Sequence, residues 1–260
     1  MSKGLSSLLD RLGEIGFERL RRAIAALALS LFVSLYLLVA LNSPPGWSAA
    51  FLALAGCYLV AFLAVAAEWF WGRWFAVGLG WSGLMVAVAS LVMVGWAPPL
   101  VIYGVLHAVI VLPLSGKKMA ARYDLQEAWR QRYRMDELGV ARLRKTVTRS
   151  AASLPSLILW ALGPKTEVAL LGCLAALALT MVGLCGVIRL RSWGILALGC
   201  AAALVGTLGH IGGFATESPG EMGMLPNVLE LVGPTFAFAF LAAAVIPFVA
   251  PAVRFLRRPS

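Results

Sequence analysis

The chain has 260 residues, of which 61% are hydrophobic and 13% are charged, and its formal net charge is +10. Soluble domains contain about 45–50% hydrophobic and about 25% charged residues, so this composition excludes a water-soluble globular fold and makes the bilayer the solvent. The basic residues stand at the ends of apolar segments and belong to no base-reading module, so we expect no nucleic-acid partner.

The N-terminal residues 1–22 combine leucines at helical spacing with both acidic and basic residues. The apolar set is Leu5, Leu8, Leu9, Leu12, Ile15 and Leu20. This pattern predicts an amphipathic helix that lies in the membrane interface. The acidic residues, and the length of the apolar segment that follows, argue against a secretory signal.

Eight apolar segments follow in chain order. They cover residues 23–41, 47–67, 74–94, 100–114, 151–162, 168–190, 193–214 and 230–253. A helix that crosses the hydrocarbon core needs about 20 residues, and 100–114 and 151–162 are the shortest of the eight. The chain is therefore predicted to be an all-α polytopic membrane protein, with transmembrane helices 1–4 in residues 23–114 and helices 5–8 in residues 151–254.

The positions of the charges predict the orientation of these helices. If the N- and C-termini are both cytoplasmic, every one of the 22 Lys and Arg residues except Lys165 lies on the inner side, including those of the basic tail 255–260. No charge falls in the middle of an apolar segment, where it would cost about 2.5–3.5 kcal/mol. The short loops and a residue usage rich in Ala, Leu, Gly and Arg are typical of a multi-pass protein of the bacterial inner membrane.

Residues 115–150 form a long basic segment on the cytoplasmic side, between helices 4 and 5. Basic residues at helical spacing oppose an apolar stripe of Leu125, Trp129 and Tyr133, which predicts two short helices on the inner surface, broken near residues 135–139. Anionic lipid headgroups attract such residues by about 1 kcal/mol each, and a docked protein partner is the alternative. The candidate lipid- or partner-binding residues are Lys117, Lys118, Arg122, Arg130, Arg134, Arg142, Lys145 and Arg149.

Matches between the two halves point to an internal repeat. LALAGC at residues 52–57 and VALLGC at residues 168–173 each open an apolar segment after an outer turn that contains proline. An inner turn with arginine follows each of them, and Trp74 and Trp193 each begin the next segment. A duplication would make helices 1–4 and 5–8 parallel copies, as in some transporters. Chance similarity between helices rich in Ala, Leu and Gly is the alternative.

Both histidines fall within apolar segments, His107 at the middle of the fourth and His210 near the outer end of the seventh. Ionisable residues inside a bilayer are functional candidates. Two helix histidines can ligate a haem, but these two lie at different depths, so we expect neither a haem nor another cofactor or metal. The alternative is that each imidazole forms a hydrogen bond with a neighbouring helix.

Two short motifs resemble those of the CAAX-type intramembrane endopeptidases. The segment EWFWGR at residues 68–73 is similar to their EExxxR motif, and the pair Tyr103 and His107 is similar to their FxxxH motif. The resemblance implies an intramembrane hydrolase in which Glu68, His107 and His210 activate water, with or without a metal. Trp69 stands in place of the second glutamate, and no Asn or Asp follows His210 at the spacing of the third motif, HxxxN.

Three functions remain open on the sequence. The favoured one is a non-catalytic membrane protein that acts as a scaffold or subunit of a larger assembly, because no charge lies at mid-membrane and the inner segments are amphipathic. The second is a carrier for a small solute or lipid, built from a 4+4 parallel repeat. The third is the intramembrane hydrolase that the motif resemblance implies.

Overall fold

The computed structural model describes residues 2–44, 46–124, 126, 129–131, 135–165, 167–209 and 225–256, and the elements it defines there are all α-helices. The predicted all-α fold is confirmed. The N-terminal helices are α1 (Ser2–Asn42), α2 (Ser48–Ala66), α3 (Gly72–Val94), α4 (Pro98–Leu114) and α5 (Lys117–Asp124). The C-terminal helices are α7 (Glu137–Leu162), α8 (Glu167–Ile188), α9 (Trp193–Leu208) and α10 (Leu225–Leu256).

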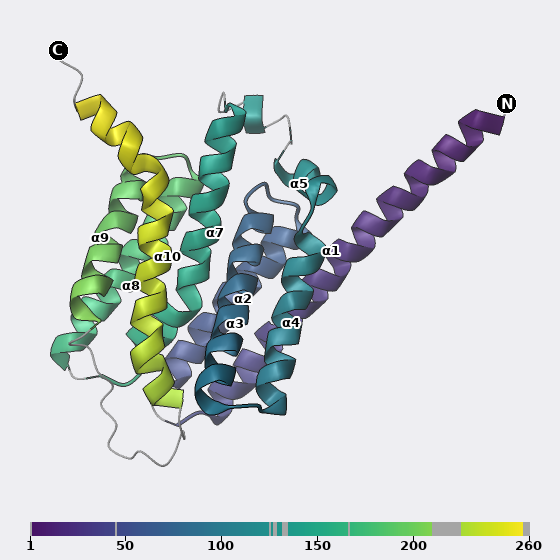
Figure 1. Cartoon of the computed structure of the whole chain (residues 1–260). Helices are drawn as coiled ribbons and strands as arrows, with labels where there is room; N and C mark the ends of the chain where they lie inside the picture. The colour runs from purple at the N-terminus through teal and green to yellow at the C-terminus, as the bar shows by residue number, and fades with distance from the viewer. Residues whose placement is uncertain are drawn as a thin grey trace.

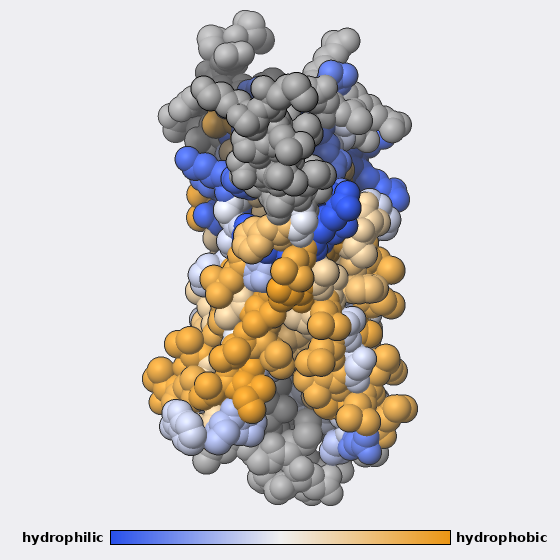
Figure 2. Space-filling view, turned by 90° about the vertical axis from the view of Figure 1, so that its right-hand side faces the viewer, coloured by the Kyte–Doolittle hydropathy of each residue, from blue (hydrophilic) through white to orange (hydrophobic). Residues whose placement is uncertain are grey.

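Four of the described helices are long and apolar enough to cross a membrane: Gly16–Asn42 within α1, all of α2 and α3, and Ala169–Ile188 within α8. α4 and α5 meet the same criterion as a pair, although the chain bends by 71° between them. α9 and Gly233–Val249 within α10 are shorter apolar helices. Figure 2 shows apolar residues around the middle of one face and hydrophilic residues gathered toward one end. These features indicate a membrane protein.

α1 is one continuous helix that includes both the predicted interfacial segment 1–22 and the first apolar segment 23–41. Pro44 is the first proline in the chain, so no residue before it removes a backbone donor or breaks the helix. Figure 1 shows the first half of α1 projecting away from the other helices as a straight extension. A change from polar to apolar composition therefore need not coincide with a break in a helix.

The described part of the basic segment is packed into the fold. Its second half continues into the fifth apolar segment as α7, whose N-cap Asp136 accepts a hydrogen bond from the backbone N–H of Gly139 at 2.7 Å. In its first half, the hydroxyl of Tyr123 donates to the carbonyl oxygen of Val65 at 3.0 Å. Trp129, expected at the membrane interface, is buried, and its ring stacks on Phe70 with 4.4 Å between centroids.

The two halves of the chain have the same order of neighbouring helices. In the first half, α1 and α3 each pack against both α2 and α4; in the second half, α7 and α9 each pack against both α8 and α10. α7 also contacts α2 and α3, and these contacts join the halves (Figure 1). α7 is therefore both a member of its own bundle and the element that links the two.

The turns that follow α2 and α8 have the same backbone hydrogen bonds. Each contains a non-glycine residue with a left-handed backbone, Glu68 with φ 54° and Leu190 with φ 58°. The next residue donates its N–H five residues back, from Trp69 to Ala64 at 3.0 Å and from Arg191 to Gly186 at 2.8 Å. This is the Schellman arrangement that satisfies the last carbonyl groups of a helix.

The helices that follow these turns also begin alike: Trp71 is the N-cap before Gly72 at the start of α3, and Trp193-Gly194 begins α9. A Cβ at Gly72 would lie 2.5 Å from the carbonyl oxygen of Ala64, and one at Gly194 would lie 2.8 Å from the backbone carbon of Gly186. Since Ala64 and Gly186 are the residues that accept the matching turn hydrogen bonds, Trp71 is the structural counterpart of Trp193. The sequence comparison had used Trp74, three residues further on, and that pairing is wrong.

Candidate functional site

His107 lies at the centre of a buried polar cluster between α1, α2 and α4. Its side chain is fully buried, its Nδ1 is 2.8 Å from the carbonyl oxygen of Tyr103, and its Nε2 is 2.8 Å from the hydroxyl of Tyr58. A carbonyl oxygen only accepts, so Nδ1 carries the proton of the neutral imidazole and Nε2 accepts from Tyr58. Both nitrogens of His107 are therefore engaged within the protein.

Aromatic rings and a glycine close the space around His107. The ring of Phe32 lies 4.1 Å from the imidazole between centroids, and the hydroxyls of Tyr36 and Tyr103 are 3.3 Å apart. On the α3 side, a Cβ at Gly83 would lie only 2.0 Å from Cδ2 of His107. Since close packing leaves no space beside the imidazole, this cluster has the geometry of a structural core rather than of a site that activates water.

Glu68 lies in a different cluster, where it joins α5 to the middle of α1 just after the end of α2. Its carboxylate forms ion pairs with Arg22 and with Arg122, the latter at 2.7 Å. Arg122 also lies 3.7 Å from Glu18, and the side chain of Gln126 donates to the backbone oxygen of Glu68 at 3.0 Å. The carboxylate that the motif resemblance offered as a catalytic group is thus held between two guanidinium groups.

Arg73 is engaged with a carboxylate other than Glu68. Its Nε donates to the backbone oxygen of Leu114 at 2.8 Å, and its Nη1 lies 3.4 Å from the carboxylate of Asp124. The indole N–H of Trp74 donates to the same carboxylate at 2.7 Å, and Arg144 lies 3.6 Å from it. Burial raises the pKa of Asp124, and the charges of Arg73 and Arg144 and the hydrogen bond from Trp74 oppose that rise.

Among the described residues, the contacts do not bring Glu68 and His107 together. The described partners of His107 are Tyr58, Tyr103 and Phe32, and none of them contacts Glu68. His210 lies outside the described residues, and so does Arg134. Within the described ranges no group of three or more His, Cys, Asp or Glu side chains lies close enough to hold a metal ion.

The predicted lipid- or partner-binding residues are divided among several environments. Arg122 is in the ion-pair cluster with Glu68. Arg142 lines a cavity of about 260 Å³, and Arg191 lines the same cavity. Lys145 and Arg149 line a second cavity, and Arg149 also donates to the backbone oxygen of Ala243 in α10. The remaining described ones are Lys117 and Lys118, which are exposed, and Arg130, which is half-buried.

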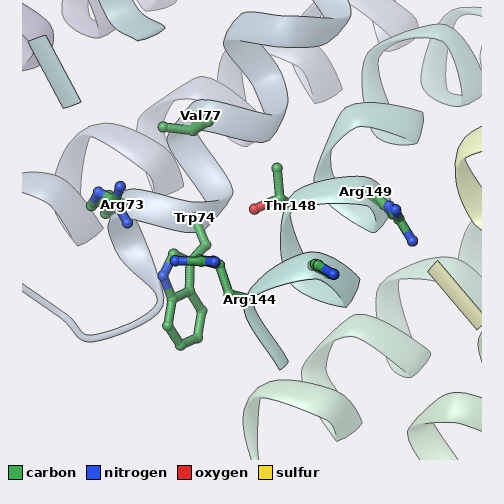
Figure 3. A pocket seen from close by; sticks show the side chains of 7 residues that line it. Arg73, Trp74, Val77, Arg144, Thr148 and Arg149 are labelled. Atoms are coloured by element: carbon green, nitrogen blue, oxygen red, sulfur yellow. The ribbon is translucent and has the colours of Figure 1, made fainter. Parts of the chain in front are cut away.

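The second cavity lies between α3 and α7 and has a volume of about 280 Å³. Its lining consists of Arg73, Trp74, Val77, Arg144, Lys145, Thr148 and Arg149 (Figure 3). Sequence reasoning missed Arg73 and Arg144 as members of one site. The available signal was weak, because Arg144 is only one of several basic residues in its segment and Arg73 precedes it by a whole helical hairpin.

No known protein family, no curated protein and no solved structure matches this chain. The functional argument therefore depends on the chain's own residues, and the similarity to CAAX-type endopeptidases extends no further than the two short motifs.

Proposed function

We propose that the chain is a non-catalytic multi-pass protein of the bacterial inner membrane that acts as a scaffold or subunit of a larger membrane assembly. The observation that carries this proposal is that the described candidate catalytic side chains already form hydrogen bonds or ion pairs with other residues of the chain. His107 has both nitrogens bonded, Glu68 is paired with two arginines, and Arg73 is paired with Asp124. Groups with such partners hold helices together rather than react.

The proposal includes eight crossings with both termini in the cytoplasm. It is supported by the four helices long enough to span a membrane and by the two bundles of four neighbouring helices. The start of α1, the end of α10 and α5 lie at the same end of the molecule (Figure 1), and with this orientation Lys165 is the one basic residue of the sequence on the outer side. The cytoplasmic end then presents the basic residues to anionic headgroups and to a protein partner.

The contacts do not favour an intramembrane hydrolase. A general base needs a free lone pair within hydrogen-bond reach of water and substrate. The Nε2 of His107 is 2.8 Å from the Tyr58 hydroxyl, and a ring packs against the imidazole at 4.1 Å. Glu68 belongs to a separate cluster, so the pair has no shared space in which a peptide bond could be hydrolysed.

The experiment that tests the subunit role uses the chromosomally tagged protein, extracted in mild detergent and separated on a native gel. We expect the wild-type chain to migrate in an assembly much larger than its own 27.7 kDa plus the micelle. Two cations of the basic segment, the exposed Lys117 and the half-buried Arg142, are replaced in the double variant Lys117→Gln/Arg142→Gln, which is expected to reduce the amount of assembly. The matched control, Glu68→Gln/His107→Asn, removes the proposed hydrolase groups and leaves those cations in place.

Two outcomes would contradict the subunit role. One is migration of the wild-type chain alone at native expression. The other is a control variant that folds and assembles normally but no longer complements a deletion strain, because that pattern is expected of an enzyme. Complementation by the control variant supports the non-catalytic role.

A carrier is the second candidate, and the observation that favours it is the similarity of the two bundles. They share the order of neighbouring helices, the Schellman turn and the Trp-Gly start of the next helix. Parallel repeats of this kind occur in transporters, where the substrate binds near the interface of the repeats. Stabilisation of the purified chain by one class of solute or lipid would support this candidate, and a flat response across a broad library would contradict it.

A further inference from the structure

The cavity between α3 and α7 concentrates positive charge. Arg73, Arg144, Lys145 and Arg149 all line it, and the described carboxylate closest to them is that of Asp124, which contacts Arg73 and Arg144. Lys145 has no partner among the described residues, and Arg149 has only the backbone oxygen of Ala243. Four cations and one carboxylate leave a surplus of positive charge in one small space.

The α3 wall of this cavity is fixed by the fold, while Arg144 and Lys145 on the α7 side are exposed. Trp74 is 1% exposed and its indole is fixed by the 2.7 Å hydrogen bond to Asp124. Toward the membrane interior α3 and α7 touch, because a Cβ at Gly78 would lie 2.3 Å from the backbone oxygen of Thr148. This contact holds α3 against α7 beside the lining residues Val77 and Thr148.

The retention of positive charge on the cytoplasmic side explains why these residues are basic, but not why they converge. Topology requires only that cations lie near the inner ends of helices, and exposed positions such as Lys117 satisfy that requirement at no electrostatic cost. Cations placed around one cavity repel one another, and a bound anion would relieve that repulsion. The convergence of residues from two helices thus indicates a ligand of opposite charge.

We propose that this cavity binds a phosphate group, either as the headgroup of an anionic lipid or as a free phosphate or pyrophosphate. Guanidinium groups present paired N–H donors that match phosphate oxygens, and the ammonium group of Lys145 adds a more compact positive charge. The volume of about 280 Å³ lies just below the range of about 300–1,000 Å³ for small-molecule sites, which suits a headgroup-sized anion. This inference is independent of the proposed subunit role, since it concerns the isolated chain.

Figure 3 shows how the lining residues are distributed. Arg73, Trp74 and Val77 come from α3 on one side, and Arg144, Thr148 and Arg149 come from α7 on the other. Asp124 competes with the anion for Arg73 and Arg144, because its carboxylate already contacts both. Removing its charge should therefore strengthen anion binding, which is an effect opposite to that of removing a lining cation.

The test uses the purified full-length chain in a neutral detergent, with dihexanoyl phosphatidic acid, inorganic phosphate and pyrophosphate as separate probes in calorimetric titrations. The cavity variant is Arg144→Gln/Lys145→Gln; both side chains are exposed, so the variant is expected to fold. The control, Lys117→Gln/Arg142→Gln, also removes one arginine and one lysine from the same end of the molecule, but both lie outside this cavity. Thermal unfolding of each variant verifies that it is folded.

We expect saturable binding of one equivalent to the wild-type chain, and a loss of affinity at least tenfold greater in the cavity variant than in the control. Asp124→Asn is expected to raise the affinity by about fivefold, the effect of one charge near a surface. Tighter binding of phosphatidic acid than of both free anions assigns the site to a lipid, and the reverse assigns it to a free phosphate compound. Equal losses in the two double variants, or no saturable binding of any probe, would overturn the proposal.

Discussion

The two bundles of this protein have the same arrangement of helices but different interiors. The first bundle is filled by large rings: Phe32, Tyr58 and Tyr103 pack against His107, and Tyr36 packs against Phe32 and Tyr58. In the second bundle, small residues let the helices touch, and Gly183, Gly186 and Gly194 bring the backbones of α8 and α9 into contact. Both halves have a close backbone contact at the start of the third helix, at Gly72 and at Gly194, but only the first adds hydrogen bonds between buried aromatic side chains and a histidine.

The two bundles show that the same arrangement of helices can be held together by different kinds of packing. Lipid tails are as apolar as leucine side chains, so association depends on van der Waals fit and on interhelical hydrogen bonds. In the first bundle, large rings supply the van der Waals contacts and the pair Tyr58 and His107 supplies an interhelical hydrogen bond. In the second bundle, glycines supply the van der Waals contacts. Two halves with such different interiors share little sequence even where their turns coincide.

The largest effect is expected where backbones touch in the second bundle. In Gly194→Ala the new methyl group would lie 2.5 Å from the backbone nitrogen of Val187 and 2.7 Å from the oxygen of Gly183, and backbone atoms cannot move aside as a side chain can. We expect the free energy of unfolding to fall by about 1–3 kcal/mol, measured by denaturation in mixed micelles.

Gly199→Ala is the matched control on the same helix. A Cβ at that position meets nothing within 4 Å, so this variant is expected to be neutral or to gain up to about 0.5–1 kcal/mol from better helix propensity. Equal destabilisation by the two variants would show that α8 and α9 are not held by close backbone contact at Gly194.

A smaller effect is expected from the hydrogen bond inside the first bundle. Tyr58→Phe removes the donor to Nε2 of His107, and a cycle with His107→Leu isolates the energy of the pair. We expect a coupling energy of about 0.6–1.7 kcal/mol, the range found for hydrogen bonds between membrane helices. Tyr36→Phe is the control. The hydroxyl of Tyr36 lies 3.3 Å from that of Tyr103, a longer contact, so its removal should lower the free energy of unfolding by less. A coupling near zero would mean that ring packing alone holds this bundle.

Apolar segments and charges in the sequence were sufficient to predict an all-helical membrane protein, because length and hydropathy are local properties. Helix ends were less predictable. The sequence divided α1 at residue 22 and α7 at residue 150 because composition changes there, whereas the backbone continues through both points. The polarity of a segment indicates whether water or lipid surrounds it, but not where the helix ends. Helix ends are indicated by residues such as proline or by capping side chains.

The site was less predictable, since it depends on contacts between distant segments. The motif resemblance grouped Glu68 with Arg73 because they are five residues apart, but the fold pairs Glu68 with Arg22 and Arg122, and Arg73 with Asp124. The alternative for His107, a hydrogen bond to a neighbouring helix, is confirmed by its contact with Tyr58. The convergence of Arg73 with Arg144 requires the packing of α3 on α7, which no local pattern encodes.

The smallest effect is expected at a feature that the two halves share, the left-handed residue in the turns after α2 and α8. Leu190 has φ 58° and Glu68 has φ 54°, and a left-handed backbone is costly for any residue with a Cβ. At each position, substitution by Gly and by Ala removes the same native side chain, so the difference between the two variants isolates the backbone strain. We expect the Gly variant to be more stable than the Ala variant by about 0.5–1 kcal/mol at both positions.

The same pairs of variants separate the shared turn from the unshared ion pairs. Both Glu68 variants lose the contacts with Arg22 and Arg122, and both Leu190 variants lose the apolar contacts of a half-buried side chain, so each is expected to be less stable than the wild-type chain. A Gly-over-Ala difference at one turn but not at the other would mean that the two turns are not equivalent. The structural argument for a repeat would then depend on the Trp-Gly pair that begins the next helix and on the order of neighbouring helices, which unrelated bundles also share.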